Sequence, residues 1–335
     1  MYKSNDGRSK GLNILVGMSG GVDSSTAALM LKEQGHKVIG VTMAIYRGKL
    51  NTTTSYKCGG ACYGPDEKED IEAARNICNQ IGIDYYVFDC VEKYNEIVLE
   101  KFKKEYLSGR TPNPCVWCNS LIKFDVLPRI ARLNGIEFDK FATGHYARIE
   151  EEDGRYILKR GKNPKKDQSY FLYRLKQEQL KNILLPLGDY TKEEIRKRAE
   201  KCGLAVADKP DSQDFYEGDY NELLGVDPKP GNIVDTDGKV LGEHQGIWNY
   251  TIGQRKGLGI SSSEALYVIE LRKDTNEVVV GFKDKIFSDR LTAVDLNWIA
   301  IDKLEKEISC QAKIRSTQSP ANVRVKPLDS GNIEV

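Results

Sequence analysis

The segment from Gly17 to Ser25 places glycines and hydroxyl side chains where an apolar run gives way to an amphipathic one. The apolar run, Ile14 to Val16, is typical of a buried strand, and Val22 to Gln34 has the pattern of a helix. Glycines at such a junction expose successive backbone N–H groups beside the positive end of the helix dipole. The segment therefore predicts an anion site with phosphate as its ligand. It lacks the Lys-Ser/Thr ending of a Walker loop and the spaced glycines of the dinucleotide fingerprint, so neither of those motifs is supported.

Cysteines supply the second candidate chemistry. Eight cysteines in 335 residues are too sparse for a disulfide scaffold. Cys115 and Cys118 form a Cys-x-x-Cys pair before a helix expected to start at Asn119, where the helix dipole would lower the thiol pKa and enrich the nucleophilic thiolate. The same spacing suits a redox pair or two metal ligands. Cys58 and Cys62 lie in a loop without periodicity, so the roles of all four thiols stay open at this point.

Strand and helix patterns alternate around these residues. Strands are expected at 14–16, 37–43, 85–88 and 138–143, and helices at 22–34, 67–80 and 92–106. This order predicts an α/β domain whose parallel sheet is covered by helices on both faces. Ligands of such sheets bind at the carboxyl ends of the strands, where the glycine loop, Met43 and Gly144 would meet.

The C-terminal half has a different pattern. Beyond Tyr216 the helix signals weaken, and Pro-Gly, Asp-Gly and Gly-x-Gly turns separate short strands. We therefore expect a first domain at residues 1–208, a small β-rich central domain at 209–283 and a β-barrel-like domain at 284–335.

Net charge and targeting signals restrict the possible functions less than the motifs do. The 50 basic and 49 acidic residues give a net charge of +1, which leaves both nucleic acids and small substrates open. Residues 1–11 contain no apolar signal region and no stretch has the length of a membrane span, so a cytoplasmic protein without a membrane partner is expected. Five cations between Lys159 and Lys166 form a cluster suited to nucleic-acid phosphates.

Several sequence runs together resemble one family. Ser-Gly-Gly-Val-Asp-Ser at 19–24 resembles the signature of the PP-loop ATP pyrophosphatases, which implies an adenine nucleotide alpha hydrolase-like fold and ATP cleavage between the alpha and beta phosphates. Further runs are Gly-Arg-Thr-Pro-Asn-Pro at 109–114, Cys118-Asn119, Ala-Thr-Gly-His-Tyr-Ala-Arg at 142–148, Lys-Asp-Gln-Ser at 166–169 and Asp-Lys-Pro-Asp-Ser-Gln at 208–213. Over nearly the whole chain these runs resemble the tRNA-specific 2-thiouridylase family.

The resemblance implies an ATP-dependent tRNA-uridine 2-sulfurtransferase. ATP would adenylate the C2 oxygen of the wobble uridine of tRNA, and sulfur delivered as a protein persulfide would replace that oxygen. Cysteine desulfurase or a sulfur-relay protein would be the donor. Asp23 would serve the Mg²⁺ that balances the phosphate charge, and Cys118 with Cys115 would be catalytic.

The resemblance also implies the binding residues. ATP would contact Gly17, Met18, Ser19, Gly20, Gly21, Val22, Asp23, Ser24, Met43 and Gly144. The tRNA would contact Asn113, Pro114, Cys115, His145, Lys166, Asp167, Gln168, Arg315 and Ser316. An extruded uridine could stack on a ring such as Trp117.

The chain departs from the family at one reactive position. Tyr216 occupies the place of the usual second cysteine, and no thiol follows it before Cys310. Two hypotheses follow. In one, Cys115 and Cys118, or one of them with Cys58 or Cys62, divide sulfur acceptance and resolution. In the other, the metal candidates Cys58, Cys62, Cys115 and Cys118 hold zinc or an iron–sulfur cluster.

Alternative functions remain open on the sequence. One is a tRNA-binding or sulfur-carrier homologue with altered or lost thiolation activity, and another is a different PP-loop ligase. The family's C-terminal barrel usually continues through a further strand segment, whereas this chain ends at Val335. We therefore expect residues 284–335 to form a truncated or differently completed barrel.

Overall fold

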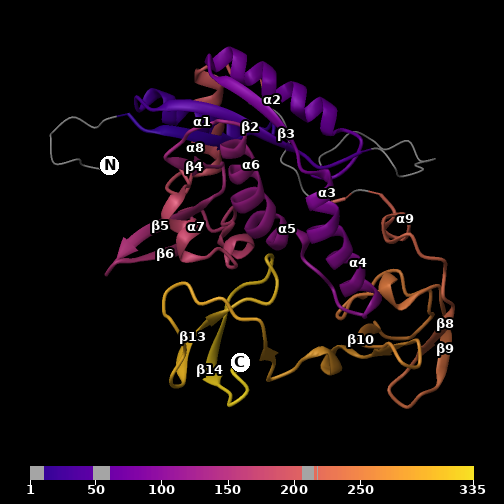
Figure 1. Cartoon of the computed structure of the whole chain (residues 1–335). Coiled ribbons are helices and arrows are strands. Elements are labelled where there is room, and N and C mark those ends of the chain that lie inside the picture. Colours follow the sequence, from indigo (N-terminus) through magenta and orange to yellow (C-terminus); the bar gives the residue numbers. More distant parts are fainter. Residues whose placement is uncertain (1–10, 48–60, 206–214, 217) are drawn as a thin grey trace.

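The computed structural model describes residues 11–47, 61–205, 215–216 and 218–335 (Figure 1). Its first unit is built on a five-stranded, wholly parallel sheet in the order β3-β2-β1-β4-β7. The strands are β1 (Asn13–Gly17), β2 (Lys37–Ala44), β3 (Asp84–Asp89), β4 (Lys140–Ala142) and β7 (Ile183–Leu184). The strands expected at the four positions named above are all present, which confirms the predicted α/β fold.

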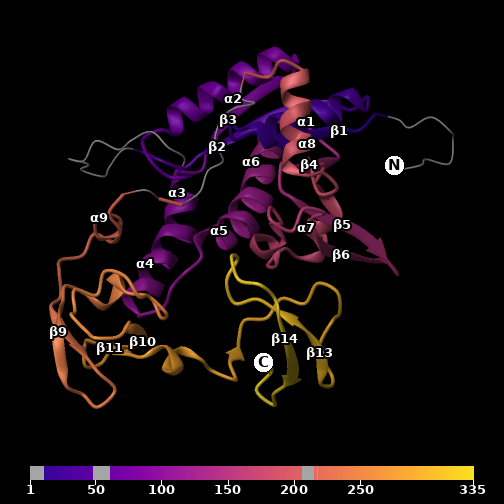
Figure 2. The same ribbon diagram turned by 180° about the vertical axis from the view of Figure 1, so that it is seen from behind.

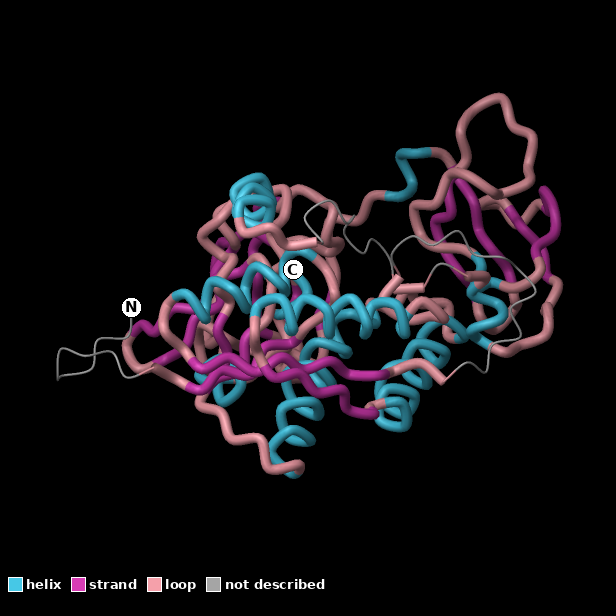
Figure 3. Tube along the Cα trace, turned by 90° about the horizontal axis from the view of Figure 1, so that it is seen from above, coloured by secondary structure: helices cyan, strands magenta, loops and turns pink. Residues whose placement is uncertain are grey.

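Helices cover both faces of this sheet, because its strand residues alternate between two cores. Ile14 and Val16 pack with residues of α1 (Val22–Glu33) and α2 (Glu67–Ile81), while Leu15 belongs to the core on the other face. Figure 3 shows α2 running along the sheet. The helices of the other face are α3 (Val91–Tyr94), the π-helical η1 (Asn95–Leu99), α4 (Glu100–Leu107), α5 (Pro114–Trp117), the π-helical η2 (Cys118–Val126) and α6 (Leu127–Leu133).

The helix predicted to start at Asn119 in fact starts at Pro114. Proline is favoured in the first helical turn because the N–H that it lacks would have no partner there. The helical path then continues from α5 through η2 into α6, so Cys115 and Cys118 lie one turn apart on it.

The chain between β4 and the central unit completes the first unit. It forms the antiparallel hairpin β5 (Ala147–Glu152) and β6 (Arg155–Arg160), the 3-10 helix η3 (Ser169–Leu172), α7 (Gln177–Asn182) and α8 (Lys192–Lys201). Helix α8 packs beside α1, as Figure 2 shows from behind.

Two smaller β units follow, as predicted. After α9 (Tyr220–Leu224), the central sheet has the order β10-β11-β8-β9, and the last sheet has the order β12-β15-β14-β13. Their elements are β8 (Gly231–Val234), β9 (Val240–His244), η4 (Ile247–Asn249), β10 (Tyr267–Arg272), β11 (Glu277–Gly281), η5 (Lys283–Ile286), β12 (Thr292–Ala293), β13 (Ile308–Ala312), β14 (Ala321–Pro327) and β15 (Ile333–Glu334). In the part of the chain that the structure describes, no helix is both long and apolar enough to span a bilayer.

Side-chain contacts fix the small units to the first one. The ring of Phe102 on α4 lies 5.7 Å from that of Tyr220 at the start of the central unit. The Arg155 guanidinium on β6 donates hydrogen bonds to the carbonyl oxygens of Ile299, at 2.6 Å, and Ile301, at 2.8 Å. These contacts place both β units on the side of the first unit that carries α4 and the β5–β6 hairpin (Figure 1).

Candidate functional site

The loop between β1 and α1 is a close-packed turn. Gly20 has a φ of 70°, in the left-handed region, and a Cβ there would lie 2.5 Å from the backbone oxygen of Asp70 on α2. The Ser24 hydroxyl sits inside the turn and accepts a hydrogen bond from the N–H of Ser19 at 3.1 Å. The first N–H groups of a helix have no partner within the helix. The loop therefore fits the phosphate site that the sequence predicts.

The neighbouring strand ends reach this loop. A Cβ on Gly144, just beyond β4, would lie 2.7 Å from the backbone nitrogen of Ser24, so only glycine allows this approach. Met43 lies at the carboxyl end of β2, whose Val41 carbonyl accepts a hydrogen bond from the Met18 N–H at 2.8 Å. The structure thus brings the predicted nucleotide residues Gly17 to Ser24, Met43 and Gly144 to one edge of the sheet, although their contacts with ATP stay a prediction.

Asp23 has partners that the sequence did not suggest. The Lys192 ammonium donates to both of its carboxylate oxygens, at 2.7 and 2.8 Å, and the Tyr146 hydroxyl donates to Oδ1 at 2.8 Å. The Lys192 side chain is only 7% exposed. Both carboxylate oxygens of Asp23 therefore already accept hydrogen bonds from the protein, and its role as an Mg²⁺ ligand stays a prediction. A lysine 169 positions away carries no sequence signal for such a pairing.

The thiols of Cys115 and Cys118 are not activated in the way that the sequence predicts. Burial raises the pKa of Cys115 to about 12, and the neighbouring thiols of Cys62 and Cys118 raise it too. Burial likewise raises the pKa of Cys118 to about 11, while the charge of Lys123 acts to lower it. The expected lowering of the thiol pKa is therefore wrong, because desolvation outweighs the helix dipole here. Lys123 is the cation that opposes this effect.

Residues 143–146 connect the glycine loop to the thiols. His145 Nδ1 shares a hydrogen bond of 2.7 Å with the Thr143 hydroxyl, and its ring lies 5.8 Å from that of Phe124 on η2. Burial, and then the charge of Lys123, holds the pKa of His145 well below its ordinary value. The segment that touches the start of α1 through Gly144 thus also packs against the helix that carries Cys118.

A metal centre does not form on the described thiols. Across residues 11–47, 61–205, 215–216 and 218–335, no three His, Cys, Asp or Glu side chains are grouped to hold a metal ion. Cys62 is exposed and Cys115 and Cys118 are partly buried, while Cys58 lies outside the described residues. Zinc or an iron–sulfur cluster therefore does not fit the described residues.

The Lys-Asp-Gln segment at 166–168 is held by hydrogen bonds between its side chains and nearby backbone groups. The Asp167 carboxylate accepts hydrogen bonds from the N–H of Gly161 at 3.0 Å and from the N–H of Ser169 at 3.1 Å. Gln168 exchanges two hydrogen bonds of 2.8 and 2.9 Å with the backbone of Tyr146. These side chains shape the turn that carries Lys166, and their contact with tRNA stays a prediction.

Other predicted tRNA residues also have internal partners. The Arg315 guanidinium donates to the carbonyl of Ile252 at 2.6 Å, and the neighbouring Ser316 carbonyl accepts from the Lys313 ammonium at 2.7 Å. Within the basic cluster, the Lys159 ammonium forms ion pairs with Glu150 and Glu152. The cluster therefore offers less free positive charge than its composition indicates.

The segment before the thiols faces the central unit. Asn113 precedes the first helical residue of α5, Pro114 is buried, and the hydroxyls of Thr111 and Thr251 lie 3.4 Å apart. The Lys101 ammonium lies 4.6 Å from the ring centre of Trp117, so one face of that ring is already covered. Trp117 is also partly buried and packs against the hydrophobic core, and its stacking on an extruded uridine stays a prediction.

Comparisons with known proteins agree with the three-part fold. Residues 12–216 match the family model described as "tRNA methyl transferase HUP domain", residues 223–282 match its "PRC-barrel domain", and residues 288–335 match an "Aminomethyltransferase beta-barrel domain". The chain is 47% identical over 328 residues to the tRNA-specific 2-thiouridylase MnmA of Endomicrobium trichonymphae, covering 97% of this chain and 91% of that protein. The chain belongs to the tRNA-specific 2-thiouridylase family.

Another relative of this thiouridylase-family chain has a similar sequence identity. It is 46% identical over 329 residues to the tRNA-specific 2-thiouridylase MnmA of Clostridium botulinum (strain Alaska E43 / Type E3), covering 96% of this chain and 89% of that one. Among solved structures, a 4-thiouridine synthetase in complex with RNA and ATP matches with a TM-score of 0.35 and 15% identity over 59% of this chain and 43% of its own.

Proposed function

We propose that this protein catalyses the ATP-dependent 2-thiolation of the wobble uridine of tRNA, as a tRNA-uridine 2-sulfurtransferase. The observation that carries the proposal is the segment 143–146, which joins the phosphate-type loop to the helix of Cys115 and Cys118. The names of relatives that share nearly half of its residues support the same reaction.

The chemistry divides between two parts of the site. The C2 oxygen of uridine is a poor leaving group until it is adenylated, and the loop amides at Gly17 to Ser24 are suited to hold the pyrophosphate that this step releases. A thiol-borne sulfur then attacks C2, and AMP leaves. Mg²⁺ would balance the phosphate charge when ATP binds. The sulfur comes from a partner such as a cysteine desulfurase or a sulfur-relay protein, in the cytoplasm.

The assay uses purified protein, unmodified tRNA, ATP, Mg²⁺ and a sulfur source. We expect AMP and pyrophosphate rather than ADP, together with 2-thiouridine in digested tRNA, measured by nucleoside mass spectrometry. The affinity for tRNA should fall as salt rises, because phosphate contacts release counterions. ATP cleavage and tRNA binding without 2-thiouridine, in air and under anaerobic conditions alike, would contradict the proposal and favour the sulfur-carrier alternative.

A further inference from the structure

Three thiols from two separate parts of the sequence lie around one buried core of the first unit. Tyr63, the residue after Cys62, and Tyr94 belong to this core, and Cys115 and Cys118 pack against it. The effect of Cys62 on the pKa values of Cys115 and Cys118 agrees with this placement. The proposed reaction needs a thiol that receives sulfur and a thiol that releases it. A cluster of three meets that need, although no sequence motif joins Cys62 to the other two.

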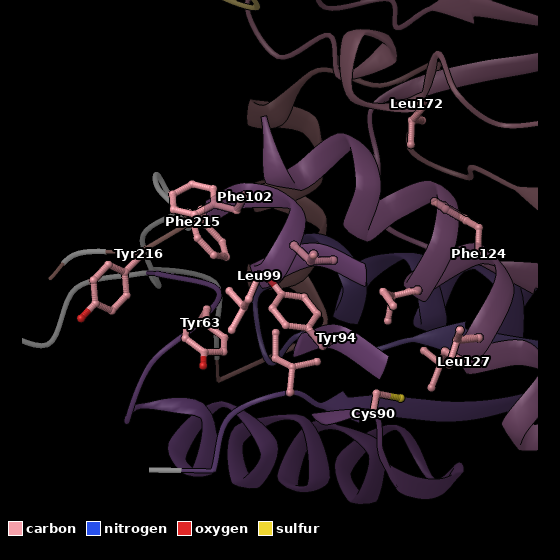
Figure 4. Packing of buried hydrophobic residues seen from close by; sticks show 14 of the residues in the cluster. Tyr63, Cys90, Tyr94, Leu99, Phe102, Phe124, Leu127, Leu172, Phe215 and Tyr216 are labelled. Atoms are coloured by element: carbon pink, nitrogen blue, oxygen red, sulfur yellow. The ribbon is translucent and has the colours of Figure 1, made fainter. Parts of the chain in front are cut away.

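Aromatic packing fixes the position of Cys62. The next residue, Tyr63, donates a backbone hydrogen bond to the carbonyl of Phe215 at 3.1 Å. Its buried ring stacks on Tyr94, with centroids 5.6 Å apart and planes inclined by 11°, and lies 6.4 Å from the ring of Tyr216 (Figure 4). The packing of Tyr63 thus holds Cys62 close to Tyr216, the position at which the family resemblance implies the second cysteine.

Exposure separates the roles within the cluster. A macromolecular sulfur donor must bring its sulfur to a thiol that it can reach, and Cys62 is the exposed member of the three. Cys115 and Cys118 are partly buried. A docked protein donor reaches an exposed thiol before a partly buried one, so the helix pair is poorly suited to be the first acceptor.

We propose that Cys62 is the thiol that accepts the transferred sulfur, and that the helix pair Cys115 and Cys118 releases it. The proposal rests on the thiolation activity proposed above. It makes the loop around residue 62, rather than the segment around Tyr216, the entry point for sulfur.

The sulfur moves in three balanced steps. The Cys62 thiolate attacks the outer sulfur of a protein persulfide, and the donor leaves as a thiolate. The outer sulfur on Cys62 then attacks C2 of the adenylated uridine, so the C–S bond forms, the C–O bond breaks and AMP leaves. A thiolate of the helix pair finally attacks the Cys62 sulfur. The electron pair of the broken S–S bond stays on the sulfur at C2, and the new protein disulfide is reduced by a dithiol.

A single-turnover experiment tests the acceptor. The full chain is loaded with inorganic polysulfide, freed of excess reagent and mixed with tRNA and ATP, and 2-thiouridine is measured. We expect Cys62→Ser to lose at least about 100-fold in rate, with Cys202→Ser, another exposed cysteine, unchanged as the matched control. Excess free sulfide should restore thiolation by Cys62→Ser, because sulfide attacks the adenylate directly. A merely structural defect would not be restored in this way.

Two further outcomes decide the proposal. The double variant with Cys115→Ser and Cys118→Ser should accumulate tRNA joined to Cys62 through an S–S bond that an added dithiol cleaves. Absence of this adduct would overturn the role of Cys115 and Cys118 in releasing the sulfur. A wild-type rate in polysulfide-loaded Cys62→Ser would overturn the accepting role. Failure of the wild-type protein to form 2-thiouridine with either sulfur source would instead refute the proposed function.

Discussion

The ion pair between Asp23 and Lys192 should contribute measurably to the free energy of unfolding. Lys192→Met removes the ammonium while keeping the length of the side chain. It leaves the Asp23 carboxylate with the Tyr146 hydroxyl as its remaining partner among the contacts described above. Breaking a buried pair costs about 3 to 5 kcal/mol, because one charge is left uncompensated. Asp23 is 28% exposed, so water screens part of this cost, and we expect the lower end of that range.

Thermal unfolding measures this effect. A loss of about 3 kcal/mol should lower the Tm by roughly 6 to 12 °C for a unit of about 200 residues. Lys197→Met is the matched control, because Lys197 is exposed on the same helix, and surface changes of this kind stay within about 0.5 kcal/mol.

A double variant tests whether Asp23 acts as the ion-pair partner of Lys192. If it does, Asp23→Asn combined with Lys192→Met should be more stable than Lys192→Met alone, because the unpaired carboxylate is gone. We expect a coupling energy of about 2 kcal/mol between the two positions. An unchanged Tm for Lys192→Met, or a coupling energy near zero, would refute the reasoning. In that case Asp23 would be available as the Mg²⁺ ligand that the sequence suggests.

Three further changes test the rest of the site. Lys123→Met should raise the pKa of Cys118 and slow its alkylation by iodoacetamide near pH 8, whereas Lys123→Arg should not, since the arginine keeps the charge. Gly144→Ala should weaken ATP binding at least about tenfold in calorimetry, because its Cβ would lie 2.7 Å from the backbone of the α1 start. The pKa of His145 is lowered in the fold, so the unfolded chain takes up its proton first, and the free energy of unfolding should fall as pH drops from 7 to 5. Urea titrations test this, and a stability that rises over that range would contradict it.

Local patterns predicted the first unit well. Short apolar runs and capped amphipathic segments predict the strands and helices of the sheet, since each of these signals lies within a few residues. The hairpin at 147–160 was not predicted, although its Asp-Gly turn at 153–154 between alternating runs was a usable signal.

The state of the side chains was harder to predict. The sequence indicated activated thiols at Cys115 and Cys118, but their pKa values depend on burial that only the packed fold supplies. Lys192 carries no signal because its partner lies far away in the chain. The proximity of Cys62 to the helix thiols likewise depends on how Tyr63 packs, which no local pattern records.

The contact between Lys192 and Asp23 also bears on how the protein is made. Asp23 leaves the ribosome early, yet its ion-pair partner follows 169 residues later. At a synthesis rate of about 5 to 20 residues per second, the loop waits roughly ten to thirty seconds for that lysine. The loop around Asp23 therefore cannot reach its final geometry in a nascent chain shorter than about 192 residues, because its lysine partner has not yet been made.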